Sequence, residues 1–344
     1  MGPSRAFMKN AKCVVVKTGT AVITEPDGKL AKDRLVDICE QVKELRDEGR
    51  DVVLVTSGAL AQGSESLSSC QQKTADSSSE SQMQTYRNAC AAVGQSKLIV
   101  AFSEAFEGLP VKIAQILVTN NDFADPGFKA KLSGTLHTLL LQGVIPIINE
   151  NDAISSKAAP SEESGDIFSD NDGLAGLIAR VCGADLLILL SDVEGLYTGP
   201  PSDPNSELIH TYFNDAIITY GEGSKAGRGG MISKVKAARH AASAGIPVVI
   251  ASGLAPDVLH RMTQGERVGT LFHKDATIAR DILLAASDSI QRLQTLSFFP
   301  DGRQQVLQDV ATVLMENEDL VKPEIEPADL QALHLWLISS FTIG

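Results

Sequence analysis

Apolar positions along the chain follow two patterns in turn, and these patterns predict alternating strands and helices. Short apolar runs bounded by glycine or polar residues are typical of strands buried on both faces of a sheet. Such runs lie at residues 13–16, 52–55, 112–118, 144–148, 186–190, 245–253 and 268–272. Between them, the i, i+3, i+4, i+7 spacing of amphipathic helices covers residues 33–47, 90–106, 129–142, 170–182 and 231–244. The alternation predicts an α/β fold with a mainly parallel sheet.

Three stretches depart from this alternation. Residues 64–84 are rich in Ser and Gln and predict a loop, either over the mouth of a site or as a tolerated insertion. Residues 153–168 predict a loop or an extended hairpin. Beyond about residue 275, helical stripes without glycine-rich turns predict two or three more helices. We therefore expect a main domain over residues 1–275 and a helical C-terminal extension over residues 276–344.

Composition narrows the class of protein. The chain has 344 residues, of which 43% are hydrophobic and 21% charged, and a formal net charge of −13. These fractions are those of an ordinary globular protein, and the negative charge argues against a nucleic-acid surface. No apolar run approaches the roughly 20 residues of a membrane span, and the N-terminus lacks the apolar core of a signal peptide.

The cysteines point to a reducing compartment. They are odd in number and form no C-x-x-C pair, which fits reduced thiols acting as small apolar residues better than a disulfide framework or a zinc site. They are Cys13, Cys39, Cys70, Cys90 and Cys182. We expect a soluble, cytoplasmic protein.

Residues suited to binding an anion follow several of the predicted strands. Lys17 and Gly19 follow the strand at residues 13–16, and Ser57 and Gly58 follow the strand at residues 52–55. A glycine turn lets backbone N–H groups approach an anion closely, and an ammonium group neutralises its charge. Taken singly, each turn is equally consistent with a surface hairpin or with packing.

Acidic and amide residues gather at other strand ends. Asn149 to Asp152 follow the strand at residues 144–148, Asp170 to Asp172 begin a helix, and Ser191 and Asp192 follow the run at residues 186–190. Such groups are costly to bury without a ligand or many hydrogen bonds. Ligands of parallel sheets bind beyond the carboxyl ends of the strands, and for Asn149 to Asp152 we favour function over a capped turn.

A glycine-rich segment over residues 221–234 precedes the last long helix and ends at Lys234, one turn inside that helix. It suits phosphate but matches neither a Walker A loop nor G-x-G-x-x-G in its strand context. Together, the turns, lysines and acid–amide clusters predict a site for a nucleotide, its metal and a small polar substrate. Phosphoryl transfer fits, since it depends mainly on positioning and charge neutralisation. No Ser-His-Asp or Cys-His arrangement stands out.

The motifs resemble those of glutamate 5-kinases of the amino-acid kinase family. Residues 12–275 contain, in the family's order, VVVKTGT, VTSGALAQG, IPIINENDAIS, SDNDGLAGLIA, ADLLILLSDVEGLYT and GRGGMISKVKAARHAASAGI. The resemblance implies a three-layer α/β/α sandwich. It also implies the ATP-dependent phosphorylation of L-glutamate to L-glutamyl 5-phosphate, the first step of proline biosynthesis.

The resemblance also implies residue roles. Lys17 and Lys234 would neutralise charge on the ATP phosphates, Asp172 would orient these lysines, and Asp170 would help to hold Mg²⁺. Ser57, Gly58, Asp152 and Asn171 match substrate-binding positions. The nucleotide-binding positions are Lys17, Ser191, Asp192, Arg228, Gly229, Gly230, Met231 and Lys234. Arg228 and Ser191 each stand where the family usually has threonine.

The resemblance extends to partners. It implies a homo-oligomer, a dimer or tetramer, and feedback inhibition by proline, which we expect to act through residues 153–168. The extension resembles the first helices of the reductase half of pyrroline-5-carboxylate synthase, so a glutamyl-phosphate reductase is an expected partner. The alternatives are another amino-acid kinase, for aspartate or acetylglutamate, and a non-catalytic regulatory or scaffolding paralogue. We expect no nucleic-acid or membrane partner.

Overall fold

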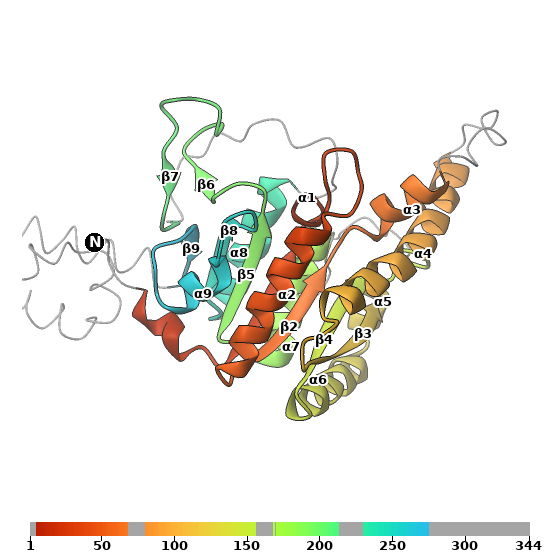
Figure 1. Ribbon diagram of the computed structural model, residues 1–344, viewed down its shortest axis with the longest axis horizontal. Helices are drawn as coiled ribbons and strands as arrows, with labels where there is room; N and C mark the ends of the chain where they lie inside the picture. The colour runs from red at the N-terminus through yellow and green to blue at the C-terminus, as the bar shows by residue number, and fades with distance from the viewer. Residues whose placement is uncertain (1–4, 68–79, 156–167, 169, 213–229, 275–344) are drawn as a thin grey trace, which may run out of the picture.

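A seven-stranded sheet lies at the centre of the protein (Figure 1). The computed structural model describes residues 5–67, 80–155, 168, 170–212 and 230–274. In spatial order the strands are β3 (Lys112–Val118), β4 (Val144–Glu150), β2 (Asp51–Thr56), β1 (Cys13–Thr18), β5 (Leu186–Ser191), β8 (Val248–Ser252) and β9 (Thr270–Phe272). The strands from β3 to β8 run parallel, and β9 is antiparallel to β8. The carboxyl ends of the parallel strands therefore meet at one edge.

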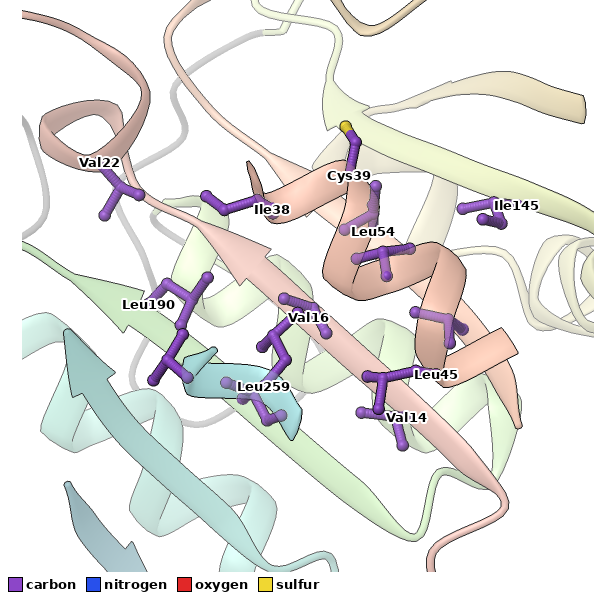
Figure 2. Packing of buried hydrophobic residues seen from close by; sticks show 14 of the residues in the cluster. Val14, Val16, Val22, Ile38, Cys39, Leu45, Leu54, Ile145, Leu190 and Leu259 are labelled. Carbon is purple, nitrogen blue, oxygen red and sulfur yellow. The ribbon is translucent and has the colours of Figure 1, made fainter. Parts of the chain in front are cut away.

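Helices cover both faces of the sheet, which confirms the predicted three-layer sandwich. Side chains alternate along β1, so Val14 and Val16 belong to one core cluster and Val15 to the other. The first cluster, shown in Figure 2, includes residues of α2 (Lys32–Asp47), α4 (Glu80–Ala105) and α9 (Val258–Thr263). The second includes residues of α6 (Pro126–Leu141), α7 (Asn171–Cys182) and α8 (Met231–Ser243).

Short elements connect these layers. They are η1 (Ala6–Asn10), α1 (Thr20–Ile23), α3 (Ala59–Leu67), α5 (Asn120–Phe123) and the two-stranded hairpin of β6 (Leu196–Tyr197) and β7 (Leu208–Ile209). Figure 1 shows α3 and α4 extending away from the sheet side by side. Their backbones touch, because a Cβ atom added at Gly63 would lie 1.7 Å from the Cys90 carbonyl oxygen, and one at Gly94 would lie 1.8 Å from that of Ala59. Only glycine allows this approach.

Several boundaries differ from the prediction. Residues 64–84 are not one loop, because α3 continues to Leu67 and α4 begins at Glu80. The polar composition hides this helical content, since α4 projects beyond the sheet and has little apolar periodicity to detect. Strand β4 also continues through Asn149 and Glu150, past the predicted end at residue 148.

Three predictions lie wholly or mainly outside the described residues, and one of them is the glycine-rich segment, of which only residues 230–234 are described. The predicted helices beyond residue 275 lie there, so the division into a main domain and an extension stays a prediction. Most of residues 153–168 lie there too. Among the helices in the described ranges, none is long and apolar enough to cross a membrane.

Candidate active site

The structure brings Lys17, Asp172 and Lys234 together at the carboxyl edge of the sheet. Lys17 lies near the end of β1, Asp172 in the first turn of α7 and Lys234 in the first turn of α8. The Lys17 Nζ lies 2.7 Å from Asp172 Oδ1, and the Lys234 Nζ lies 3.0 Å from Asp172 Oδ2. We call these three residues the lysine cluster. One carboxylate therefore holds two ammonium groups from different elements.

The fold explains this convergence. Lys17 comes two residues after Val15 and so faces the side of the sheet that α7 and α8 cover. Asp172 and Lys234 lie 62 residues apart in the chain, yet both α7 and α8 begin at this edge. The exposed fractions are 5% for Lys17, 1% for Asp172 and 7% for Lys234. The cluster is thus almost fully removed from water.

Burial and mutual charge set the protonation of the cluster. Burial by itself raises the pKa of Asp172, but the ammonium groups of Lys17 and Lys234 outweigh it and hold this pKa below its usual range. Burial, assisted by the charge of Lys234, lowers the pKa of Lys17. Two lysines face one carboxylate within the cluster, which suits the approach of an anionic ligand, and the charge of Asp170 also acts on Lys17.

A glycine leaves space beside these ammonium groups. Gly19 lies between β1 and α1, and a Cβ atom added there would stand 3.6 Å from the Lys17 Nζ and 3.8 Å from the Lys234 Nζ. A side chain at this position would occupy the space that faces both lysines. The backbone turn is therefore suited to a ligand approaching the cluster.

Asp170, the predicted Mg²⁺ ligand, is the N-cap of α7. Its Oδ1 accepts hydrogen bonds from the backbone N–H groups of Asp172 and Gly173, each at 3.0 Å. Its Oδ2 accepts a hydrogen bond from the Ser233 hydroxyl of α8. The side chain is thereby fixed beside the lysine cluster and ties together the first turns of the two helices that form it.

Ser57 and Gly58 lie at the end of β2, next to β1. The Ser57 hydroxyl donates to the Thr18 carbonyl at 3.1 Å and receives a hydrogen bond from the Thr20 hydroxyl at 3.2 Å. Gly58 has a φ of 103°, a left-handed conformation that favours glycine. The chain turns here from β2 into α3, and the turn faces the same edge as Lys17.

Asn149, Glu150, Asn151 and Asp152, which we call the acid–amide cluster, lie at the end of β4. Glu150, Asn151 and Asp152 line a pocket of about 290 Å³ that residues of α3, α4 and β3 complete. Asn149 is buried, and its amide donates to Gln95 Oε1 of α4 at 2.7 Å. The cluster thus presents half-buried carboxylates to an open pocket.

Asn171 connects the two clusters. It begins α7 one residue before Asp172, and its Oδ1 accepts a hydrogen bond of 3.4 Å from the backbone N–H of Glu150. The predicted substrate-binding residues Ser57, Asp152 and Asn171 therefore lie around the carboxyl ends of β2 and β4, beside the lysines. The two clusters border one continuous region of this edge.

The predicted nucleotide residues are only partly within the described ranges. The Ser191 hydroxyl at the end of β5 donates to Asp192 Oδ1 at 3.1 Å, and the Ser191 carbonyl accepts from Gly253 N–H at 2.8 Å. Gly230 is the N-cap of α8 and Met231 its first residue, so both stand one turn before Lys234. Arg228 and Gly229 lie outside the described residues.

Three residues at the site were missed by the sequence interpretation. Thr20 bonds Ser57, Ser233 bonds Asp170, and Gln95 bonds Asn149. Ser233 directly precedes Lys234 and Thr20 directly follows Gly19, so their neighbours gave a usable signal. Gln95 had none, because only the packing of α4 against β4 brings it to the site.

Comparison with known proteins agrees with this geometry. The model of the amino acid kinase family matches residues 12–252. A pyrroline-5-carboxylate synthase of Solanum lycopersicum is 49% identical over 96% of this chain and 47% of its own length. A glutamate 5-kinase of Symbiobacterium thermophilum is 37% identical over 79% of this chain and 99% of its own length.

Solved structures support the fold. An isopentenyl phosphate kinase covers 76% of this chain with a TM-score of 0.51 at 19% identity, and the UMP kinase of Bacillus anthracis covers 77% with a TM-score of 0.51 at 16% identity. The chain spans about half the length of the pyrroline-5-carboxylate synthase it matches. The predicted resemblance is confirmed: the chain belongs to the amino acid kinase family and is similar to glutamate 5-kinases.

Proposed function

We propose that this kinase transfers the terminal phosphoryl group of ATP to the side-chain carboxylate of L-glutamate, the first step of proline biosynthesis. The product would be L-glutamyl 5-phosphate. The observation that carries the proposal is the lysine cluster, in which one buried carboxylate holds two buried ammonium groups beside the Gly19 turn. The names of the relatives supply the identity of the acceptor.

The lysine cluster supports an in-line phosphoryl transfer. Charge spreads over the oxygens of the transferring group, so fixed cations on either side lower the barrier. Lys17 and Lys234 would take these positions, and Asp172 would keep them oriented before the substrate arrives. Gly58, Ser191, Asp192 and the start of α8 would position the nucleotide and the transferred group.

The acceptor needs no general base in this mechanism. A glutamate carboxylate, with an unperturbed pKa near ~4.3, is already ionised at neutral pH. Ser57, Asp152 and Asn171 would hold the amino acid, with the Asp152 carboxylate suited to its ammonium group. In this arrangement, the acid–amide cluster would bind the amino-acid substrate and the lysine cluster would bind the phosphates.

The residues present fit Mg²⁺ delivered with the nucleotide. Mg²⁺ commonly binds through one or two carboxylates, phosphate oxygens and waters. The Asp170 carboxylate stands fixed beside the lysine cluster and would supply a protein ligand to the ion, which would neutralise phosphate charge. Across the described ranges, no three His, Cys, Asp or Glu side chains form a metal-binding group of their own.

The wider assembly follows from the same proposal. We infer a homo-oligomer that proline inhibits, and a reductase activity that consumes the unstable acyl phosphate. The pyrroline-5-carboxylate synthase relatives extend well beyond the part that this chain matches, which supports the reductase as a partner.

The test is the ATP- and Mg²⁺-dependent formation of γ-glutamyl hydroxamate from glutamate and hydroxylamine. We expect a signal with glutamate and none with aspartate or acetylglutamate. A signal with one of the other acceptors alone would overturn the substrate. Silence with all three acceptors, in a folded protein that binds ATP, would instead favour the non-catalytic scaffolding role.

A further inference from the structure

Two cysteine thiols meet at the opposite end of the sheet from the active site. Cys13 begins β1, and Cys182 is the last residue of α7. The Cys13 and Cys182 side chains pack against the same core cluster, the second one, and each thiol shifts the pKa of the other. Nothing in the proposed kinase reaction uses these groups.

The backbone holds the two residues in register. Gly183 ends α7 with a left-handed φ of 63°, and the chain turns directly into β5. Two residues later, Asp185 N–H donates to the Cys13 carbonyl at 2.9 Å, and the Cys13 N–H donates to Asp185 Oδ2 at 2.9 Å. Because α7 ends three residues before Asp185, this two-way link holds the end of α7 near the start of β1.

The pair differs from the other cysteines that the structure describes. Cys39 and Cys90 are buried, whereas Cys13 and Cys182 are half-buried. The pKa is raised for Cys39 by burial and for Cys182 by its interaction with Cys13 and by burial, whereas the pKa of Cys13 is lowered. Cys13 and Cys182 both remain free thiols packed against the core, which agrees with the prediction of reduced thiols acting as small apolar residues.

We propose that Cys13 and Cys182 are a redox-sensitive dithiol that closes to a disulfide when the protein meets a peroxide. The inference is independent of the proposed kinase substrate. It concerns a modification site that links β1 to α7, the two elements that carry Lys17 and Asp172 at their other ends.

The chemistry balances with one peroxide per pair. The interaction with Cys182 lowers the pKa of Cys13, against burial and the carboxylates of Asp51 and Asp185, so Cys13 is the first nucleophile. Its sulfur attacks hydrogen peroxide, the O–O bond breaks, and a sulfenic acid and hydroxide form. The sulfur of Cys182 then displaces hydroxide from the sulfenic acid. The two thiol protons leave with the two hydroxides as water.

The disulfide would cross-link the fold at a distance from Lys17 and Asp172. Cys13 lies four residues from Lys17, about 13 Å along a strand, and Cys182 lies ten residues from Asp172, about 15 Å along a helix. A bond between them closes a loop of roughly 170 residues, and long loops gain most from a cross-link. We expect the melting temperature to rise by about 5 °C or more on oxidation.

Peptide mapping tests the bridge directly in the full chain. The reduced protein is treated with hydrogen peroxide, quenched with iodoacetamide and digested with trypsin. Cleavage after Lys12, Lys17 and Arg180 places the two cysteines in separate peptides. We expect these peptides to be joined by a bond that dithiothreitol breaks, and the melting temperature to rise and fall with that bond.

Variants sharpen the test. Cys182→Ser should abolish both the linked peptide and the temperature shift, whereas the matched control Cys70→Ser should keep both. All variants should retain kinase turnover within about twofold. Alkylation of both thiols after peroxide, a link through Cys70, or a linked protein with an unchanged melting temperature would each overturn the proposal. The mapping needs no variant, so a poorly folding mutant leaves the test intact.

Discussion

The two clusters at the carboxyl edge of the sheet differ in how their charges are balanced. In the lysine cluster, every charged side chain is buried and paired before any ligand binds. In the acid–amide cluster, Asn149 is buried, whereas Glu150, Asn151 and Asp152 are half-buried and line an open pocket. The first arrangement is preorganised for charge that develops during a reaction, and the second is open to select a substrate.

Because of this contrast, we expect mutations in the two clusters to change different quantities. Changes in the lysine cluster should affect stability and kcat, because its groups are fixed and, in the proposed mechanism, act on the transition state. Changes in the acid–amide cluster should mainly affect KM for the acceptor. The following experiments test that division, from the largest expected effect to the smallest.

Replacing Asp172 should have the largest effect. Asp172→Asn would deprive two buried ammonium groups of the carboxylate that pairs with both, and we expect the free energy of unfolding to fall by about 3–5 kcal/mol. Urea unfolding measures this. As a control, Glu266→Gln removes the exposed partner of Arg261 and should cost under about 1 kcal/mol. Equal losses in the two variants would refute the contrast.

Removing one lysine should mainly affect turnover. For Lys17→Ala or Lys234→Ala we expect kcat to fall by about 100- to 1,000-fold, equal to roughly 3–4 kcal/mol of transition-state stabilisation. The hydroxamate assay measures this, with circular dichroism to show that the protein is folded. Lys236→Ala alters an exposed lysine of the same helix α8 and should stay within about twofold of the wild type. Unaltered rates in both the Lys17→Ala and Lys234→Ala variants would overturn the assignment of these lysines to phosphoryl transfer.

Changing Asp152 should alter acceptor binding. Asp152→Asn removes the charge from a hydrogen bond worth about 1.5–3 kcal/mol, so we expect KM for glutamate to rise about 10- to 100-fold. KM for ATP should stay within about twofold and serves as the internal control. A variant that loses affinity for ATP instead would place Asp152 on the nucleotide side.

Lowering the pH should reduce the contribution of Asp172 to the stability of the folded protein. Its pKa is lowered in the folded protein, so it contributes stability above the unfolded value of ~3.9 and loses it as the pH falls through the folded value. The difference in melting temperature between wild type and Asp172→Asn should therefore be constant from about pH 7 to 5 and shrink below about pH 4. A difference that grows on acidification would contradict the sign of this pKa shift.

The sheet was predictable from the sequence because its strands are buried on both faces. An unbroken run such as residues 186–190 has no other stable placement in a structure of this class. The position of the site followed, since Lys17, Ser57, Asn149 and Ser191 all stand at carboxyl ends. The helix α4 was harder to bound because its first turns project beyond the core and carry no apolar periodicity.

The contacts within the site were not predictable to the same degree. The pairing of Asp172 with both lysines depends on how α7 and α8 pack together, which no local pattern reports. The roles of Gln95 and Ser233 depend on the same kind of packing. A single sequence therefore placed the candidate residues at one edge of the sheet, and the three-dimensional structure was needed to show which side chains meet.

The backbone contact between α3 and α4 has a mechanical consequence for the acceptor pocket. Ala59 of α3 and Gln95 of α4 both line that pocket, and Gly63 and Gly94 hold the two helices at their closest approach. The distance between the two helices is therefore set by the absence of a side chain at these two glycines. One methyl group at either glycine would push the helices apart and widen the pocket, while every polar residue of the site would stay chemically unchanged.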